Sequence, residues 1–503
     1  MKKSTLVAAP LIIVAATAGA TPWYAGMRAE QAMRTGAETL GSGKQSPLAV
    51  SYTRFERGWL KSEAVSRIAL KADPSIYFEV RHEISHMPNR AGWVHVHSVP
   101  QLTGPVKANL DYYFGGQPPI AVDTVVGYDG THIMQFNSPA FSKPLHQQPE
   151  MTVSWGGLQG TLTIDANNHW VGTATVPSLA VEGGDTQATL TALKVDGAWD
   201  VRGTAIDWQG ETKMGLSEFR VVTPLQQFAL KDVTGTTYQR SNGNSVLVGY
   251  ALRIGLGSAA HAGATSQTIS NAVLELELDK LDKKALSKYI ADLSNAEQLT
   301  MAPDARARLA AQLVMNLGGD LLRGSPELRI KQLGVETPAG SVLAHAVVTF
   351  DGSNLADIPF SPELLTRIKA KADVKLSGAL LRTQLQQQVR SKVEVALREQ
   401  GGLSTEENIR MMSEKVIEDQ LKGYTDAGLL RANGPDFTIE AEFAAGQMLV
   451  NGMPANQLFG GLLAAPAPAA PLAPEKVPER EAAAPAGSTA LAPPPVLPRT
   501  QYR

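Results

Sequence analysis

The sequence predicts an α+β protein: an N-terminal transmembrane helix, one large curved antiparallel β-sheet, and helices inserted in the C-terminal half. Three observations lead to this fold class. An uncharged apolar run lies near the N-terminus, short alternating apolar and polar runs continue to about residue 278, and apolar residues then recur about every four positions. The sheet is expected to be antiparallel, because parallel strands need crossover helices and no convincing helix interrupts the alternating region.

The N-terminal run predicts a membrane anchor. The stretch from Leu6 to Ala20 carries no charged residue. About 20 such residues cross a hydrocarbon layer of about 30 Å as a helix. Lys2 and Lys3 are then expected on the cytoplasmic side, and Trp23 and Tyr24 at the opposite interface. The rest of the chain would lie outside the cytoplasm.

A cleaved signal peptide is the alternative for this segment. Ala16-Thr17-Ala18 and Ala18-Gly19-Ala20 both match the small-residue pattern of a cleavage site. The uncharged run continues past both sites, which favours a retained anchor.

Composition limits the classes of function. The chain of 503 residues is too long for one ordinary domain. It contains no cysteine, which excludes thiol nucleophiles, disulfides and thiolate metal sites and suits an oxidising compartment. Lys+Arg 46 against Asp+Glu 48 argues against nucleic acid as a partner. We expect four regions: 1–26, the anchor; 27–278, β-rich; 279–463, mixed α/β and completing the sheet; 464–503, a disordered Ala/Pro-rich tail.

After a short helix from Met27 to Leu40, the first half reads as strands separated by turn pairs such as Asp129-Gly130 and Asn242-Gly243. The clearest predicted strands are Ile76–Val80, Trp93–His97, Val106–Tyr112, Gly160–Asp165, Ala188–Val195 and Asn271–Leu278.

The second half mixes helices and strands. One helix is expected to start with Asp279 as its N-cap, and a second to run from Ala305 to a stop at Gly318-Gly319. Strands are expected at Pro326–Leu333 and Leu343–Phe350, and in a closing hairpin of Phe437–Phe443 with Gln447–Val450. Three further helices are expected between these strand regions: one capped by Ser361-Pro362, one carrying Leu381 to Val393, and one opening with the capping box Ser404-x-x-Glu407. Their apolar stripes are narrow, which predicts packing on the sheet or on each other; attachment to a membrane surface is the alternative.

One motif resembles a catalytic site. His82-Glu83-Ile84-Ser85-His86 matches H-E-x-x-H, in which two histidines one helical turn apart bind zinc and the glutamate activates water. Here the flanking residues alternate with a strand period, so Glu83 is expected to point away from both histidines. Pro88 would also end a zinc-binding helix too early. We therefore expect a strand rather than a protease site.

Three other patterns are weaker. His95 and His97 share a strand face and could meet His82 and His86 to bind a metal, but a polar sheet face is the favoured interpretation. Gly255–Ala260 imitates a dinucleotide-binding fingerprint without a following helix, which favours a turn or bulge. Gly41-Ser42-Gly43-Lys44 lacks the first glycine and the Ser/Thr of a phosphate loop. We therefore expect no enzyme activity, catalytic residue, cofactor or metal.

Several segments together resemble one family. They are Tyr52–Ala64 (YTRFERGWLKSEA), His82-x-Ile84-x-His86-x-Pro88, Ser325–Ile330 with Glu336–Gly340, and Gly446–Pro454 (GQMLVNGMP). In this order they resemble the YdgA-like proteins of Gram-negative bacteria, a family of unknown function. The resemblance covers residue 1 to about 463; Met87 departs from it, since the family usually has glycine there. It implies a single-pass inner-membrane protein with a periplasmic body, and no catalytic residues.

Two functions are favoured over the remote alternative of a zinc hydrolase acting through His82-Glu83-x-x-His86. The first is a non-enzymatic, membrane-anchored protein in envelope structure or biogenesis. The second is a carrier of lipid or another hydrophobic ligand along a sheet groove, by analogy with the fold of AsmA-like proteins. A continuous exposed apolar patch on the sheet would favour the carrier.

Overall fold

The computed structural model describes residues 27, 30, 48–71, 77–261, 266–297, 303–353, 363–399 and 405–458. The predicted anchor, the Gly41–Lys44 segment and the predicted tail lie outside these residues. The described residues belong to one compact unit that ends at Leu458. None of the helices in the described ranges is both long and apolar enough to span a membrane.

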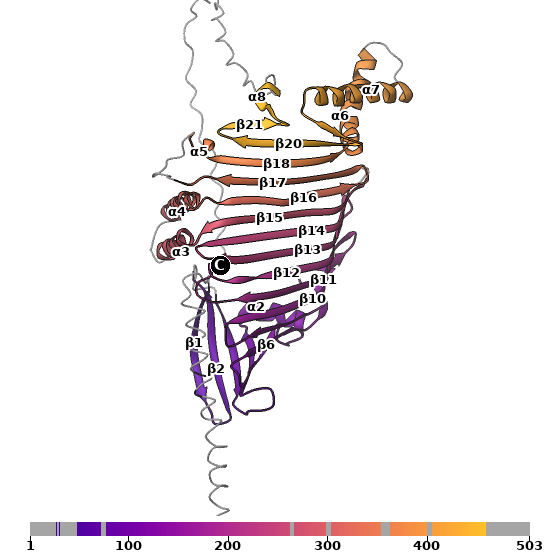
Figure 1. Ribbon diagram of the computed structural model, residues 1–503. Coiled ribbons are helices and arrows are strands. Elements are labelled where there is room, and N and C mark those ends of the chain that lie inside the picture. Colours follow the sequence, from indigo (N-terminus) through magenta and orange to yellow (C-terminus); the bar gives the residue numbers. More distant parts are fainter. Residues whose placement is uncertain are drawn as a thin grey trace, which may run out of the picture. The chain divides into compact units, whose positions relative to one another are not determined.

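All described strands form one antiparallel sheet of 22 strands (Figure 1). The N-terminal strands are β1 (Leu48–Arg57), β2 (Lys61–Leu70), β3 (Tyr77–Ser85), β4 (Val94–Gln101), β5 (Ala121–Val126), β6 (His132–Ser138), β7 (Phe141–Leu145), β8 (Gln148–Trp155) and β9 (Leu158–Ile164). Long strands follow: β10 (His169–Gly183), β11 (Thr186–Asp200), β12 (Gln209–Val222), β13 (Gln226–Asn242), β14 (Ser245–His261) and β15 (Gln267–Asp282). The last are β16 (Glu327–Thr337), β17 (Gly340–Phe350), β18 (Ile368–Ser377), β19 (Arg431–Asn433), β20 (Asp436–Ala444), β21 (Gln447–Val450) and β22 (Met453–Pro454).

Strand order follows chain order almost throughout. The ladder runs from β1 to β6, then through β9 to β10, and on strand by strand to β18, β20, β21 and β22. The hairpin β7–β8 pairs with the second half of β10, and β19 pairs with β20. Because neighbouring strands are mostly neighbours in sequence, short turns suffice to connect them.

The helices are insertions between strands. They are α2 (Gly104–Phe114), α3 (Lys283–Glu297), α4 (Pro303–Arg323), α5 (Glu363–Thr366), α6 (Gly378–Glu399), α7 (Glu406–Asp426) and α8 (Ala455–Leu458). In Figure 1, α3 and α4 lie beside one end of the long strands, and α6 and α7 beside the other.

Most predicted strands are confirmed, and one is wrong. The segment from Val106 to Tyr112 forms α2 instead of a strand. Pro105 lies in its first turn and Gly115 ends it in the left-handed conformation, with φ 63°. The ring of Phe114 lies 4.9 Å from that of Phe141, which anchors the helix to β7. The alternating pattern of this segment also fits an i, i+4 spacing, and the residues at its two ends favour the helix.

Several predicted helix boundaries are also wrong. The strand β15 continues past Asp279, and Asp282 caps α3 by accepting a hydrogen bond from the Ala285 N–H at 2.8 Å. The helix α4 continues through Gly318-Gly319 to Arg323. The cap of α7 is Thr405, whose hydroxyl accepts from the Asn408 N–H at 3.4 Å. Strand β18 is not among the predicted strands, because its alternating Lys and Ala residues are only weakly apolar.

The prediction that the C-terminal helices pack on one another is confirmed for α6 and α7. Their shared core consists of Leu385, Val389, Val393, Leu397, Ile409, Ile417, Leu421 and Leu430. Phe437 and Ile439 of β20 pack against this core. The helical pair therefore buries its narrow stripes within itself and against one corner of the sheet.

The long strands share a transverse line of irregular positions. One residue in each successive strand is left out of the regular ladder pairing, and these residues lie on one line across the sheet: Pro177, Ala192, Ser217, Asp232, Gly255 and Asn271. In every second strand the residue on this line has positive φ: 53° at Ala192, 53° at Asp232 and 47° at Asn271. Apolar residues also change phase there: Met214 and Leu216 precede the line in β12, whereas Phe219 and Val221 follow it. Irregularities that recur in register bend a sheet along a line.

Substitutions on this line have a predicted effect on stability. A left-handed residue costs roughly 1–2 kcal/mol unless it is glycine, whereas glycine in a regular strand costs about 0.5–1 kcal/mol. Ala192→Gly is therefore expected to raise the free energy of unfolding by up to about 1 kcal/mol, and Ala192→Val to lower it by more than about 1 kcal/mol. Urea denaturation measures both. The control is Ala188→Gly in the same strand, which is expected to destabilise; equal effects of the two glycine substitutions would contradict the prediction.

Candidate functional site: the inner face of the sheet

One face of the long sheet carries rows of apolar side chains across the strands; we call it the inner face. Because residues opposite each other in a ladder point to the same side, the register identifies these rows. One row consists of Val176, Leu193, Leu216, Val233, Ile254 and Ala272. The next consists of Ala174, Val195, Met214, Gly235, Leu252, Leu274, Leu333, Ala344, Val374 and Ile439.

The opposite face is polar. The row next to the second apolar row, on the side away from the first, consists of Asp196, Lys213, Thr236, Ala251, Glu275 and Gln332. Glu277 on this face accepts hydrogen bonds from the Tyr238 hydroxyl at 2.5 Å and the Lys331 ammonium at 2.6 Å. Burial raises the pKa of Tyr238 to about 12, and its hydrogen bond to Glu277 acts in the same direction. Polar groups of the outer face are thus paired with one another by hydrogen bonds and ion pairs.

The inner face is largely open. Leu333 is 45% exposed, and Met214, Val248, Leu278 and Leu328 are exposed to a similar degree. A hollow of about 410 Å³ lies on it, lined only by apolar residues and glycine: Leu252, Ile254, Ala272, Val273, Leu274, Leu333, Gly334, Val335 and Val342. Continuous exposed apolar surface is a common feature of binding surfaces, so this face is the candidate functional site.

Helical pairs border the inner face at opposite ends of the strands. Leu286 and Ile290 of α3 and Leu321 of α4 pack against Val246 and Leu281, at the end of β14 and β15. At the other end the α6–α7 core covers Phe437 and Ile439. In the described part of the chain, the helices thus contact the edges of the inner face and leave its middle open (Figure 1).

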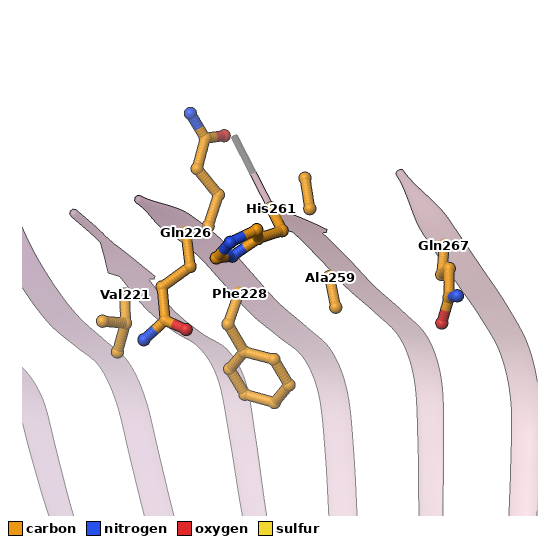
Figure 2. Close-up of a pocket in the computed structure, with 8 residues that line it drawn as sticks. Val221, Gln226, Phe228, Ala259, His261 and Gln267 are labelled. Carbon is orange, nitrogen blue, oxygen red and sulfur yellow. The ribbon is translucent and has the colours of Figure 1, made fainter. Parts of the chain in front are cut away.

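A second hollow, of about 510 Å³, lies beyond the line of irregular positions. Figure 2 shows Val221, Phe228 and Ala259 following one another across neighbouring strands, with His261 near the strand end. The strands in this view bend in the same direction. Glutamines 226, 227 and 267 also line this hollow, so it is more polar than the one around Leu274.

The inner face continues in register into the N-terminal strands, where it becomes buried. From Ala174 the row passes through Gly160, Phe136, Val122, Ser98, His82, Ala64 and Phe55. Ala64 of this row forms a closed core with Ile84 and Val94 on the same face, and Ile84 is only 1% exposed. The same face is therefore a core at its N-terminal end and an open surface along the long strands.

The histidines of the H-E-x-x-H motif belong to this closed core. As predicted, the motif lies on a strand, with His82 on the inner face and Glu83 on the outer face. His82 contacts the Ser66 hydroxyl through Nε2 and the Ser98 hydroxyl through Nδ1, both at 2.8 Å. His86 is fully buried and contacts the Ser62 hydroxyl through Nε2 at 2.7 Å. The two rings serve as hydrogen-bonded core residues rather than as a pair with a glutamate between them.

The electrostatics agree with that structural role. Burial lowers the pKa of His82 to about 4. Burial, and secondarily the charge of Arg57, lower the pKa of His86. Both rings are therefore neutral at pH 7.

The structure does not bring the four histidines together. His95 and His97 lie on the outer face of β4, because Glu83 pairs with His97 and His82 with Ser98. His97 Nδ1 lies 2.6 Å from an Asp123 carboxylate oxygen. Within the described ranges no group of three or more metal-binding side chains is arranged to hold an ion. The four-histidine hypothesis is therefore wrong, and the polar-face interpretation of His95 and His97 is confirmed.

The pseudo-dinucleotide segment is part of β14, and the next described element is the strand β15 and not a helix. Of the expected turn or bulge, the structure shows no turn here but a bulge-like irregularity, because Gly255 lies on the line of irregular positions. A Cβ at Gly255 would lie 2.9 Å from that of Asp232, which explains the glycine by close packing.

Comparison with known proteins identifies the family of this chain. A family model described as bacterial protein of unknown function (DUF945) matches residues 1–456. The chain belongs to the DUF945 family. A search of curated proteins and one of solved structures return no match. The family therefore places the chain among bacterial proteins, and its function has to be argued from the surface itself.

Sequence reasoning did not predict which face of the sheet stays open. The narrow apolar stripes of the C-terminal helices are the feature of the sequence that indicates an uncovered sheet face. Helices that bury their stripes on each other have no apolar surface left to cover a long sheet.

Proposed function

We propose that this DUF945 protein is a non-enzymatic, membrane-anchored protein of the bacterial envelope that binds lipid acyl chains along its inner face. The observation that carries the proposal is the open apolar middle of that face, bordered at both strand ends by helices. Each CH₂ group moved from water to such a surface contributes about 0.8 kcal/mol. The uncharged segment from Leu6 to Ala20 and the YdgA-like resemblance support a position at the inner membrane, with the body in the periplasm.

The surface suits an elongated apolar ligand. The rows cross every strand from β10 to β15, and the second row reaches β20. No charged residue occurs in either row. A compact polar substrate would find few partners here, whereas an acyl chain needs none.

The histidine motif supports the non-enzymatic part of the proposal. Both rings are engaged by serine hydroxyls inside a core, and Glu83 lies on the other face. A water-activating glutamate needs to share the site with the metal ligands.

Photocrosslinking in cells tests lipid binding with the full chain. A benzophenone amino acid is placed at Leu252 or Leu333 of the inner face, and lipid adducts are detected by mass spectrometry. We expect phospholipid adducts at both positions. Matched controls are Arg253 and Gln332, which are adjacent in sequence and face the other side.

The comparison between faces decides the outcome. Equal adduct yields at Leu252 and Arg253 would indicate only that the protein is near a membrane, and would refute lipid binding by the inner face. Protein adducts at Leu333 in place of lipid would favour the second candidate, an envelope protein whose inner face docks a protein partner.

A further inference from the structure

The turn between β1 and β2 carries an unusual surface for an exposed turn. Trp59 is 59% exposed and Leu60 45% exposed. Met87, which follows β3, is 55% exposed. The N–H of His86 donates to the Leu60 carbonyl at 2.8 Å, so the backbones of the two segments lie side by side. We call these segments, residues 57–61 and 86–90, the β-tip.

The β-tip is rigidly built although its apolar side chains are exposed. A Cβ at Gly58 would lie 2.1 Å from the Lys61 carbonyl oxygen, so only glycine fits the turn. The Gly58 N–H donates to the Ser62 hydroxyl at 3.3 Å, and that hydroxyl also contacts the buried His86 ring. The three apolar side chains are therefore held in the solvent by an ordered base, which argues for a purpose beyond folding.

Basic residues flank these apolar side chains. Lys61 follows Trp59-Leu60, and Arg90 lies in the segment that contains Met87; Arg57 precedes Gly58, although its charge is paired with Glu30. Tryptophan and leucine flanked by cations match the interface of a bilayer that contains anionic lipid. A protein partner would need a recess for the tryptophan, whereas a bilayer accepts all three side chains without one.

A described residue near the N-terminus links the β-tip to the predicted anchor. The Arg57 guanidinium donates a hydrogen bond to the Glu30 carboxylate. Glu30 follows Ala20, the end of the apolar run, by ten residues. Ten residues span about 15 Å as a helix and at most about 35 Å when extended. The apolar run therefore ends, at Ala20, no more than about 35 Å of chain away from Glu30, which contacts Arg57 beside the exposed tryptophan.

We propose that the β-tip inserts Trp59, Leu60 and Met87 into the interface of an anionic bilayer, as a second membrane contact beside the N-terminal segment. This inference rests on the proposed position at a membrane, but not on lipid binding by the inner face. Two contacts, in place of one tether, hold the body in a defined orientation relative to the bilayer.

Site-specific labelling tests the proposal on the full chain, because the protein contains no cysteine. Single variants Trp59→Cys and Met87→Cys carry an environment-sensitive fluorophore in vesicles of phosphatidylethanolamine and phosphatidylglycerol. Lipids with a nitroxide near the headgroup are expected to reduce the emission about twofold at both positions. The control is Leu225→Cys, an exposed apolar residue (66% exposed) in the turn between β12 and β13, where little quenching is expected.

A label at Ile12→Cys separates failure of the β-tip from failure of the anchor. Quenching at residue 12 by a nitroxide deep in the acyl chains, without quenching at 59 and 87, would overturn the β-tip contact while the anchor stands. Quenching at 59 and 87 without quenching at 12 would support the β-tip and refute the anchor. Quenching at only one of the two tip positions, or equally at 225, would also overturn the proposal.

Discussion

Replacing Leu252, Leu274 and Leu333 together by Gln is expected to abolish recovery of lipid with the purified protein. The three side chains are ladder partners in one row of the inner face and line the same hollow. Loss of about 1 kcal/mol of apolar contact at each position weakens binding by about 3 kcal/mol, or about a hundredfold. Quantitative mass spectrometry of lipid extracted from equal amounts of protein measures the loss.

The same substitutions are expected to leave the fold intact, because the face is already in contact with solvent. Leu333, for example, already exposes nearly half of its surface. The matched control is the triple variant Arg253→Gln, Glu275→Gln and Gln332→Asn on the outer face, which is expected to retain lipid. Equal lipid recovery from both triple variants, with both folded by circular dichroism, would rule out the inner face as the binding surface.

Acidification from pH 7 to pH 4 is expected to lower the free energy of unfolding by up to about 3 kcal/mol through His82 alone. The pKa of this ring is about 4 in the folded protein, against a value of 6.5 for an unperturbed histidine. The unfolded chain therefore binds the proton more tightly. The contribution of His82 to the free energy of unfolding is fully present above pH 6.5. It is lost as the pH falls from 6.5 towards 4.

The surroundings of His82 identify the cause. The structure places the Ser66 and Ser98 hydroxyls and the Tyr52 ring against it, and none of these is charged at pH 5. Burial of the imidazolium would therefore be uncompensated. His86, with a pKa lowered by burial, contributes in the same direction.

Urea denaturation at several pH values, with the wild type and His82→Gln side by side, measures this contribution. Glutamine can hydrogen-bond to a serine hydroxyl but does not titrate. The variant is expected to lose less stability than the wild type between pH 6.5 and 4.5. Parallel pH profiles for the two proteins would show that His82 does not titrate with a lowered pKa.

Much of the sheet could be predicted from the residues because strand alternation is a local signal. The alternation around His82 showed that Glu83 faces away from both histidines, and the register of β3 with β4 confirms it. Of the six strands named from the sequence of the first half, five coincide with strands of the structure, and the sixth forms α2. Local spacing failed there because one set of positions fits both a strand and a helix, and only contact with Phe141 and the helix-end residues distinguishes them.

The candidate site could be predicted only in part. Each strand shows which residues share a face, but not whether another element covers that face. The recurrence of Ala192, Asp232 and Asn271 on one transverse line also depends on the register of strands that are far apart in sequence. Positive φ at alanine has no signature in the residue itself, so the line of irregular positions could not be found from composition or period.

The sequence by itself determined the antiparallel sheet, its apolar and polar faces and the absence of thiol chemistry, since each follows from residue type and short-range period. It also predicts the anchor and tail, which lie outside the described residues. The tertiary structure decided that the inner face is closed around Ile84 and open around Leu274. The physical reason is that burial depends on where the helices pack: α6 and α7 bury their stripes on each other, and the middle of the long sheet stays open.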